Sequence, residues 1–167
     1  MFLKLFEHTI SKEGYFNKLD ADTGDGDMGT GVSLAGKELI KINSSRLDEP
    51  QFIDEYLFEM GDNMARVMGG SSGPFYAAFL MRWAVVFKQA RQGSQNWKIV
   101  ELIYRSFEEG KAAIQYLGRA EYTDRTMLYV LDKISVSLKV LVEKENLEKV
   151  GMEEIWQVAL KSAEIGC

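Results

Sequence analysis

Residues 97–117, WKIVELIYRSFEEGKAAIQYL, predict the fold class of this chain. Their apolar side chains recur at steps of three, four and seven residues, which places them on one face of an α-helix. The residues on this face are Val100, Ile103, Phe107, Ile114 and Leu117. A helix with one apolar stripe buries that stripe against another element. We therefore expect residues 97–117 to form one helix of a packed helical domain.

The same helical spacing recurs along the rest of the chain. It is found in segments 51–68, 75–90, 125–143 and 152–165. The repeating residues are Ile53, Tyr56, Met60, Met64 and Val67; Phe75, Phe79, Trp83 and Val86; Met127, Val130, Ile134, Leu138 and Leu141; and Met152, Ile155, Ala159 and Ala163, with Trp156 alongside. Two earlier helices are predicted, over about 2–19 with a break at Gly14 and over about 30–42 with Thr30 as N-cap.

Strict alternation of apolar and polar residues never lasts long enough to predict a sheet. Polar turns are predicted at 43–50, 91–96 and 118–124, the last ending in Asp124 as the N-cap of the next helix. The Met and aromatic stripes are interpreted as core. We expect an all-α fold of antiparallel amphipathic helices, with a single domain over 1–167.

The composition excludes several classes of protein. The 167 residues carry a net charge of −5, and no segment is basic enough to follow a nucleic-acid backbone. An apolar share of 46% argues against disorder. No apolar run approaches the ~20 residues that a membrane-spanning helix needs, and the N-terminal sequence lacks a signal-peptide pattern.

The chain has one cysteine and one histidine. Cys167 alone excludes an internal disulfide and a cysteine zinc site, which favours a reducing, cytoplasmic compartment. His8 alone excludes an HExxH site and would have to serve any Ser-His-Asp triad. We expect His8 to lie at the surface or at the edge of the core.

Residues 20–29, DADTGDGDMG, combine three glycines with the four carboxylates of Asp20, Asp22, Asp25 and Asp27. Such carboxylates repel one another unless a cation lies between them, and carboxylate oxygens are the ligands that Mg²⁺ and Ca²⁺ prefer. The glycines permit the sharp turns that let these side chains converge. The segment predicts a divalent metal site, and the alternative is an acidic turn at a helix boundary.

Two known loop types do not match this segment. The spacing Gly24-x-Gly26-x-x-Gly29 matches the dinucleotide fingerprint, but no strand precedes it and its aspartates would repel a pyrophosphate. An EF-hand counted from Asp20 needs a glutamate at position twelve, where this chain has Gly31.

A second unusual loop lies at 69–73, GGSSG, directly before Pro74 and an apolar helical face. Proline suits the first turn of a helix, and the N–H groups of a helix start bind anions. The loop is therefore either an anion site or a plain helix-initiating turn. It is not a Walker A loop, because no Gly-Lys-Ser/Thr follows. Together with a metal loop it suggests phosphoryl transfer, with metal and glycine-serine turn on neighbouring phosphates.

Three short motifs in order resemble one family. They are LDADTGDGDMG over 19–29, GGSSG over 69–73 and DRTM over 124–127. Together they resemble the nucleotide-binding L-type (DhaL) domain of dihydroxyacetone kinases, also called glycerone kinases, over most of the chain. The resemblance implies a barrel of antiparallel helices with ADP or ATP bound at one end, and a role in glycerol metabolism.

The resemblance also implies a set of functional residues. It implies two Mg²⁺ ions held by Asp20, Asp25 and Asp27, while Asp22 is not at a ligand position of the family. The positions matching nucleotide contacts are Met28, Gly29, Thr30 and Gly31 against the phosphates, Ser71 and Ser72 as phosphate-binding serines, and Gly118 and Met127 near the adenine. No protein nucleophile is required, so no catalytic residue is assigned.

The chain departs from the family pattern in two places. Met28 stands where members often carry histidine. The chain ends with 163–167, AEIGC, before the late Gly-Arg-Ala-Ser-Tyr-like loop, the Asp-Pro-Gly turn and the closing helix of the family. We therefore expect a truncated domain that lacks its last helix or helices, with an exposed apolar face and either marginal stability or association with another chain, including a homo-oligomer.

The resemblance implies a phosphoryl-donor module that transfers phosphate to dihydroxyacetone held covalently by a histidine of a separate K-type domain or subunit. His8 is not in a matching context, so this chain alone is expected to bind nucleotide and not ketone. Neither nucleic acid nor membrane is expected as a partner. The alternatives are a non-catalytic regulatory or binding protein that keeps the scaffold, and an incomplete gene product without activity.

Overall fold

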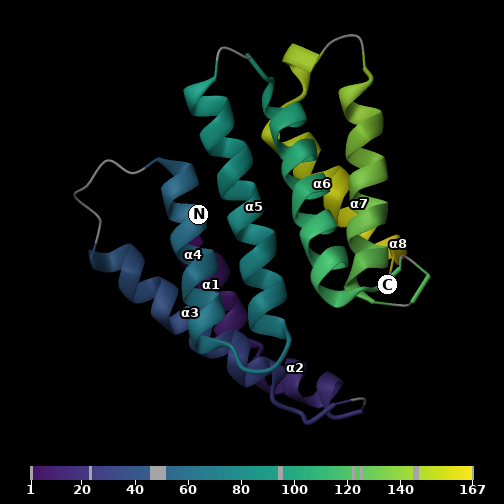
Figure 1. Cartoon of the computed structure of the whole chain (residues 1–167). Coiled ribbons are helices and arrows are strands. Elements are labelled where there is room, and N and C mark those ends of the chain that lie inside the picture. The colour runs from purple at the N-terminus through teal and green to yellow at the C-terminus, as the bar shows by residue number, and fades with distance from the viewer. Residues whose placement is uncertain are drawn as a thin grey trace. The chain divides into compact units, whose positions relative to one another are not determined.

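A computed structural model describes residues 2–22, 24–45, 52–93, 96–121, 123–124, 126–144 and 147–166. All regular secondary structure in these ranges is helical, which confirms the predicted all-α class (Figure 1). The elements are α1 (Phe2–Ser11), α2 (Glu13–Asp20), α3 (Met28–Ser45), α4 (Ile53–Val67), α5 (Ser72–Gln92), α6 (Ile99–Gly118), α7 (Met127–Val142), the 3₁₀ turn η1 (Leu147–Lys149) and α8 (Met152–Gly166). In the part of the chain so described, no helix combines the length and apolar character needed to cross a membrane.

The chain divides into two compact units, Met1–Ala77 and Ala78–Cys167. The first contains α1 to α4 and the start of α5, and the second contains the rest of α5 and the helices that follow.

In the first unit, α3 is the central helix, because α1, α2 and α4 all pack against it. Its buried residues Ala35 and Leu39 are each 1% exposed. They share a core with Phe6 of α1 and with Leu57 and Met60 of α4. This packing holds the N-terminal end of α3 beside the C-terminal end of α2, where the acidic loop lies.

Two predicted helix boundaries in this unit are wrong. The break between the first two helices falls at Lys12 and not at Gly14. Just before the break, the Ser11 hydroxyl donates to the His8 carbonyl, one of the carbonyls at the end of α1 that have no partner inside the helix. Helix α3 begins at Met28, so Thr30 is not its N-cap. Two side chains of α2 supply acceptors for the first turn of α3 instead, Asp20 for the Met28 N–H and Asn17 for the Thr30 N–H.

The second unit is built on an aromatic cluster between α5 and α6. Trp83 lies with its ring centroid 5.0 Å from Phe107 and 5.6 Å from Phe79, and it stacks on Phe87 at 6.4 Å. Gly110 of α6 lies under Phe79, since a Cβ there would come within 2.5 Å of that ring. Figure 1 shows α6, α7 and α8 side by side, and these three helices pack pairwise.

The predicted apolar faces are confirmed at most positions and wrong at a few. Val100, Leu138 and Ile155 are completely buried. The exposed exceptions are Ile53, Leu117, Met152 and Trp156. The first three lie in the first or last turn of their helices, and Trp156 follows the buried Ile155 on α8. The exposed position of His8 matches the expectation for this residue.

The predicted N-cap Asp124 is also wrong. The cap of α7 is Thr126, whose hydroxyl oxygen accepts a hydrogen bond from the Leu128 N–H at 3.2 Å. The Asp124 carboxylate instead accepts from the Glu121 N–H at 2.7 Å, because it closes the preceding turn. The short turn η1 was not predicted.

A buried ionic cluster joins α6 to α7. The Lys111 ammonium lies 2.7 Å from the Glu108 carboxylate and 3.0 Å from that of Asp132, and Lys111 as a whole is only 7% exposed. The buried Ser135 hydroxyl donates to Glu108. Burial opposes ionisation of Glu108, but the hydrogen bonds from Lys111 and Ser135 and the Lys111 charge outweigh it, so the pKa of Glu108 lies below its ordinary value.

Candidate metal centre and adjoining pocket

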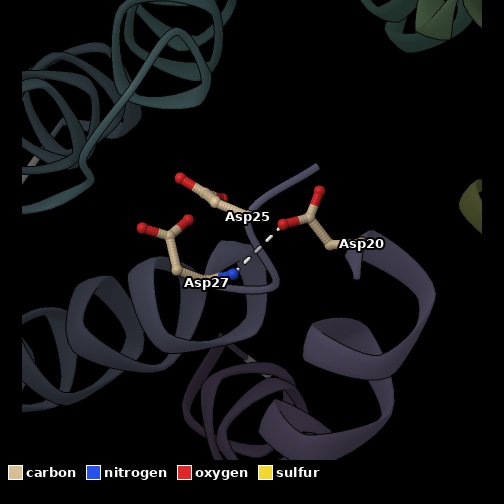
Figure 2. Close-up of side chains that lie close together, drawn as sticks. All are labelled: Asp20, Asp25 and Asp27. Carbon is tan, nitrogen blue, oxygen red and sulfur yellow. Dashed lines mark hydrogen bonds between the residues drawn. The ribbon is translucent and has the colours of Figure 1, made fainter. Parts of the chain in front are cut away.

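The carboxylates of Asp20, Asp25 and Asp27 converge in the first unit. One oxygen atom from each lies within 4.8 Å of the others. Figure 2 shows the three side chains around the turn that joins α2 to α3. Asp25 and Asp27 are exposed and Asp20 is half-buried. Asp22 is exposed and does not belong to this group.

Backbone hydrogen bonds to Asp20 hold the loop in shape. Its Oδ2 accepts from the N–H groups of Gly26 at 2.9 Å, Asp27 at 3.1 Å and Met28 at 3.4 Å. Figure 2 marks the bond from the Asp27 amide. The Met28 N–H is the first of α3 and the other two donors directly precede this helix, so a carboxylate at the end of α2 holds the loop against the start of α3. The other oxygen, Oδ1, takes no part in these bonds.

Two glycines make this wrapping possible. Gly26 has φ of +77°, a conformation that residues with a side chain rarely adopt. Gly24 lies so close to Asp20 that a Cβ would come within 2.7 Å of Oδ1. The alternation of Asp and Gly in 24–27 thus follows from the need to fold the backbone around one carboxylate.

The negatively charged side chains of this loop repel one another. A hydrogen bond with Asp25, the negative charge of Asp25 and a smaller contribution from Asp20 raise the pKa of Asp27. Neighbouring carboxylates behave in this way because each disfavours the ionised form of the next. A divalent cation removes that cost, and three carboxylate oxygens form a donor set suited to a hard cation such as Mg²⁺. The residues present therefore fit such an ion.

A pocket of about 110 Å³ adjoins the acidic loop within the same unit. Its lining residues are Asp27, Met28, Thr30, Gly31, Leu34, Val67, Met68, Gly69 and Ser72. The pocket thus connects one carboxylate of the loop, the first turns of α3, and the start of α5. Five site residues predicted from the sequence line this pocket: Asp27, Met28, Thr30, Gly31 and Ser72. They come from two segments about 40 residues apart.

The glycine-serine loop turns sharply between α4 and α5. Gly70 has φ of +62°, and Gly73 leaves room for the Met68 carbonyl, which a Cβ there would approach to 2.6 Å. The Ser71 carbonyl accepts from the Phe75 N–H at 3.3 Å, so Ser71 occupies the N-cap position of α5. Ser72 lines the pocket, whereas Ser71 is exposed and does not.

Gly29 has a different surrounding from its neighbours Met28 and Thr30. It is buried against α2 and does not line the pocket. A Cβ on Gly29 would overlap the Glu13 carbonyl oxygen and lie 2.7 Å from Asn17 Oδ1. The close crossing of α2 and α3 is therefore the structural use of this glycine.

The remaining two predicted positions lie in the second unit. Gly118 is the last residue of α6 and is exposed, and Met127 is the first residue of α7 and is half-buried. They flank residues 119–126 in the sequence. Arg119, the residue after Gly118, has the left-handed backbone with φ of +48°.

Sequence reasoning missed Asn17, Leu34 and Met68. Asn17 is hydrogen-bonded to Thr30, and the other two are apolar lining residues of the pocket. The one available signal for Asn17 was its position three residues before Asp20, which puts both on one face of α2. For Leu34 and Met68 no motif distinguishes a pocket wall from an ordinary core residue.

Comparison with known proteins identifies the family. A family model described as the DAK2 domain matches residues 22–167. The chain belongs to the DAK2 domain family. This confirms the resemblance to the L-type domain that the three sequence motifs indicated.

Two individual proteins with similar sequences are described as DhaL subunits of dihydroxyacetone kinases. The chain is 33% identical over 120 residues to the ADP-binding subunit DhaL of PEP-dependent dihydroxyacetone kinase 2 from Listeria innocua, covering 71% of this chain and 53% of that protein. It is 28% identical over 150 residues to the corresponding DhaL subunit of Escherichia coli K12, covering 90% of this chain and 68% of that one. The chain thus spans about half the length of the Listeria relative.

A solved DAK2 structure matches the fold. The dihydroxyacetone kinase of Citrobacter freundii, in complex with AMP-PNP and Mg²⁺, superposes with a TM-score of 0.68 at 27% identity. The match covers 99% of this chain and 28% of that one.

Proposed function

We propose that this DAK2 chain is a nucleotide-binding, phosphoryl-donor module of a dihydroxyacetone kinase. The observation that carries the proposal is the convergence of the Asp20, Asp25 and Asp27 carboxylates beside a pocket. Related proteins support it, since one is described as an ADP-binding subunit of such a kinase and a similar structure contains AMP-PNP and Mg²⁺.

In this proposal the three aspartates hold two Mg²⁺ ions. The nucleotide phosphates lie along the start of α3 and the start of α5. The residues assigned to the nucleotide are Met28, Gly29, Thr30, Gly31, Ser71, Ser72, Gly118 and Met127. Gly29 acts there by allowing α2 to approach α3, and Gly118 and Met127 by contact with the base. The prediction of a single domain over residues 1–167 is part of this proposal.

The chemistry requires positioning and charge rather than a nucleophile from the protein. When bound, Mg²⁺ neutralises charge on the phosphate groups and orients the one that is transferred. The Asp20 carboxylate holds the start of α3 in place through its Oδ2 atom. The first-turn N–H groups of α5 are suited to anionic oxygens, whereas the N–H groups of Met28 and Thr30 at the start of α3 are bonded to side chains of α2. Ser72 adds a hydroxyl donor at the pocket wall.

The acceptor is proposed to be dihydroxyacetone held by a K-type domain or subunit, with the encounter taking place in the cytoplasm. The chain alone would bind nucleotide without turning over the ketone. Mixing the chain with a K-type subunit, ATP or a phosphorylated relay, and dihydroxyacetone tests the transfer step. Binding of nucleotide without any transfer would favour the non-catalytic regulatory alternative.

Nucleotide binding is expected to raise the stability of the protein in a Mg²⁺-dependent manner. At an ADP concentration of about 100 times the dissociation constant, linkage predicts a gain of about 2.7 kcal/mol in the free energy of unfolding. Thermal unfolding with ADP and Mg²⁺, with ADP and EDTA, and without either would measure it. Equal unfolding temperatures in all three conditions would overturn the proposal.

Replacement of Asp25 by asparagine is expected to affect metal-free stability and Mg²⁺ affinity differently, which distinguishes repulsion between the carboxylates from metal binding. Asp25→Asn removes the charge that raises the pKa of Asp27, so the metal-free protein should be at least as stable as the wild type. Mg²⁺ affinity should fall at least about tenfold, because an anionic ligand is lost. Asp27→Asn should behave alike.

Asp22→Asn is the matched control, since it makes the same charge change in the same loop outside the converging group. Titration of Mg²⁺ into the three proteins, followed by denaturant unfolding of the metal-free forms, makes the comparison. Loss of metal-free stability in Asp25→Asn with unchanged Mg²⁺ affinity would instead identify a purely structural turn.

A further inference from the structure

Asn17 makes two hydrogen bonds between α2 and the first turn of α3. Its Oδ1 accepts from the Thr30 N–H at 3.0 Å, and its Nδ2 donates to the Thr30 hydroxyl oxygen at 3.0 Å. The backbone bond satisfies one of the four N–H groups at the start of α3 that have no partner inside the helix. The second bond turns the Thr30 hydroxyl toward α2, where it also lies 3.5 Å from Glu13.

This pair lies one helical turn from the candidate metal ligands on both helices. Asn17 precedes Asp20 by three residues on α2, and Thr30 follows Asp27 by three residues at the start of α3. Residues three apart share a helix face, with Cβ atoms about 5–6 Å apart. A change in the spacing of Asn17 and Thr30 is therefore transmitted directly to Asp20 and Asp27.

Two contacts fix the start of α3 on α2. Gly29 sets the separation, because only the absence of a side chain allows the Glu13 carbonyl so close. The Asn17 pair sets the rotation of the first turn of α3, because both bonds are lost if Thr30 turns away. Asp27 directly precedes this turn and its carbonyl accepts from the Gly31 N–H, so the orientation of the turn determines where Asp27 lies.

We infer that Asn17 is a positioning residue for the metal site: through Thr30 it holds Asp20 and Asp27 at the separation that a divalent ion requires. The inference rests on the proposed function. Asn17 does not itself act as a ligand, since its Oδ1 and Nδ2 atoms are both engaged by Thr30.

The test uses Mn²⁺ as the metal probe, with binding followed by electron paramagnetic resonance in the presence and absence of ADP. Asn17→Ala and Thr30→Val should each weaken Mn²⁺ binding about tenfold, the range typical of residues that orient metal ligands. Because both act through one contact, the double variant should be no weaker than the weaker single variant. Thr30→Ser, which keeps both bonds, should restore in the absence of ADP the Mn²⁺ affinity that Thr30→Val loses.

Ser44→Ala is the control, since it removes a side-chain hydrogen bond, to the Ile40 carbonyl, at the far end of the same helix. It should leave Mn²⁺ affinity unchanged. Far-UV circular dichroism verifies folding. If Asn17→Ala does not fold, Thr30→Val decides, because it keeps the bond from the Thr30 N–H.

Wild-type Mn²⁺ affinity in Asn17→Ala or Thr30→Val, additive losses in the double variant, or a Thr30→Ser protein as weak as Thr30→Val would each overturn the inference. In those cases the wild type still binds the ion, so the proposed function stands. A wild-type protein that binds no Mn²⁺, with or without ADP, would overturn both.

Discussion

Replacement of Gly29 by alanine is expected to destabilise the first unit by about 3 kcal/mol, at the upper end of the usual cost of overpacking. The new Cβ would overlap the Glu13 carbonyl oxygen and lie 2.9 Å from the Asn17 backbone nitrogen and 2.7 Å from its Oδ1. Two of these three atoms belong to the backbone of α2 and cannot rotate away. The helix itself must therefore move, which also separates Asp20 from Asp27.

Urea unfolding of Gly29→Ala and Gly14→Ala provides a matched comparison. Gly14 also lies in a helix of this unit, but no atom lies within 4 Å of a Cβ built there. Gly14→Ala should therefore be neutral or stabilising by up to about 1 kcal/mol, the helix-propensity difference. Equal stability of the two variants would contradict the close crossing of α2 and α3.

Replacement of Lys111 by methionine is expected to destabilise the second unit by about 3 kcal/mol at pH 7. Removing one partner of a buried ionic cluster typically costs ~3–5 kcal/mol, and the lower end applies because the Glu108 and Asp132 side chains are 41% and 28% exposed. The two carboxylates on α6 and α7 would then face each other without the ammonium between them.

This cost should decrease as the pH falls. In the wild type the pKa of Glu108 lies below its ordinary value, so its contribution to stability is present above that value and is lost as the pH falls through the lowered pKa. In Lys111→Met, the burial of Glu108 and the negative charge of Asp132 remain, and both raise the pKa of Glu108. Protonation of Glu108 at lower pH therefore removes the repulsion that destabilises the variant. The difference in unfolding free energy between the two proteins should thus narrow from pH 7 toward pH 4.

Lys144→Met serves as the control for Lys111. Its ammonium lies 2.7 Å from Glu154, but the two side chains are 49% and 43% exposed. Exposed pairs contribute at most about 1 kcal/mol. Urea unfolding at several pH values compares the two variants, and a Lys144 variant as costly as the Lys111 variant would contradict the assigned role of burial.

The interior of each long helix was predictable from spacing alone. Val100, Ile103 and Phe107 are all buried as their periodicity predicts, because a 3.6-residue repeat leaves only one face for the core. Helix ends were less predictable. Leu117 belongs to the same repeat but is 50% exposed, because its burial depends on what lies opposite the last turn and not on its spacing.

The N-caps also divide into what local sequence predicts and what the tertiary structure decides. Asp124 and Thr126 are both favourable N-cap residues by type, and local sequence does not distinguish them. Asp124 instead closes the turn before α7, which leaves Thr126 as the cap. At the start of α3 no local side chain supplies the acceptors, since they are Asp20 and Asn17 on the preceding helix.

The sequence by itself determined the helical class, the family and the identity of the acidic and glycine-serine loops, because each depends on residue types at short, fixed spacings. Only the tertiary structure decided that Asp20 bonds the backbone leading into α3, that Gly29 packs against α2, and that Asn17 is bonded to Thr30. These contacts join residues on different helices. They depend on how closely the two helices cross, a distance that no spacing along the chain encodes.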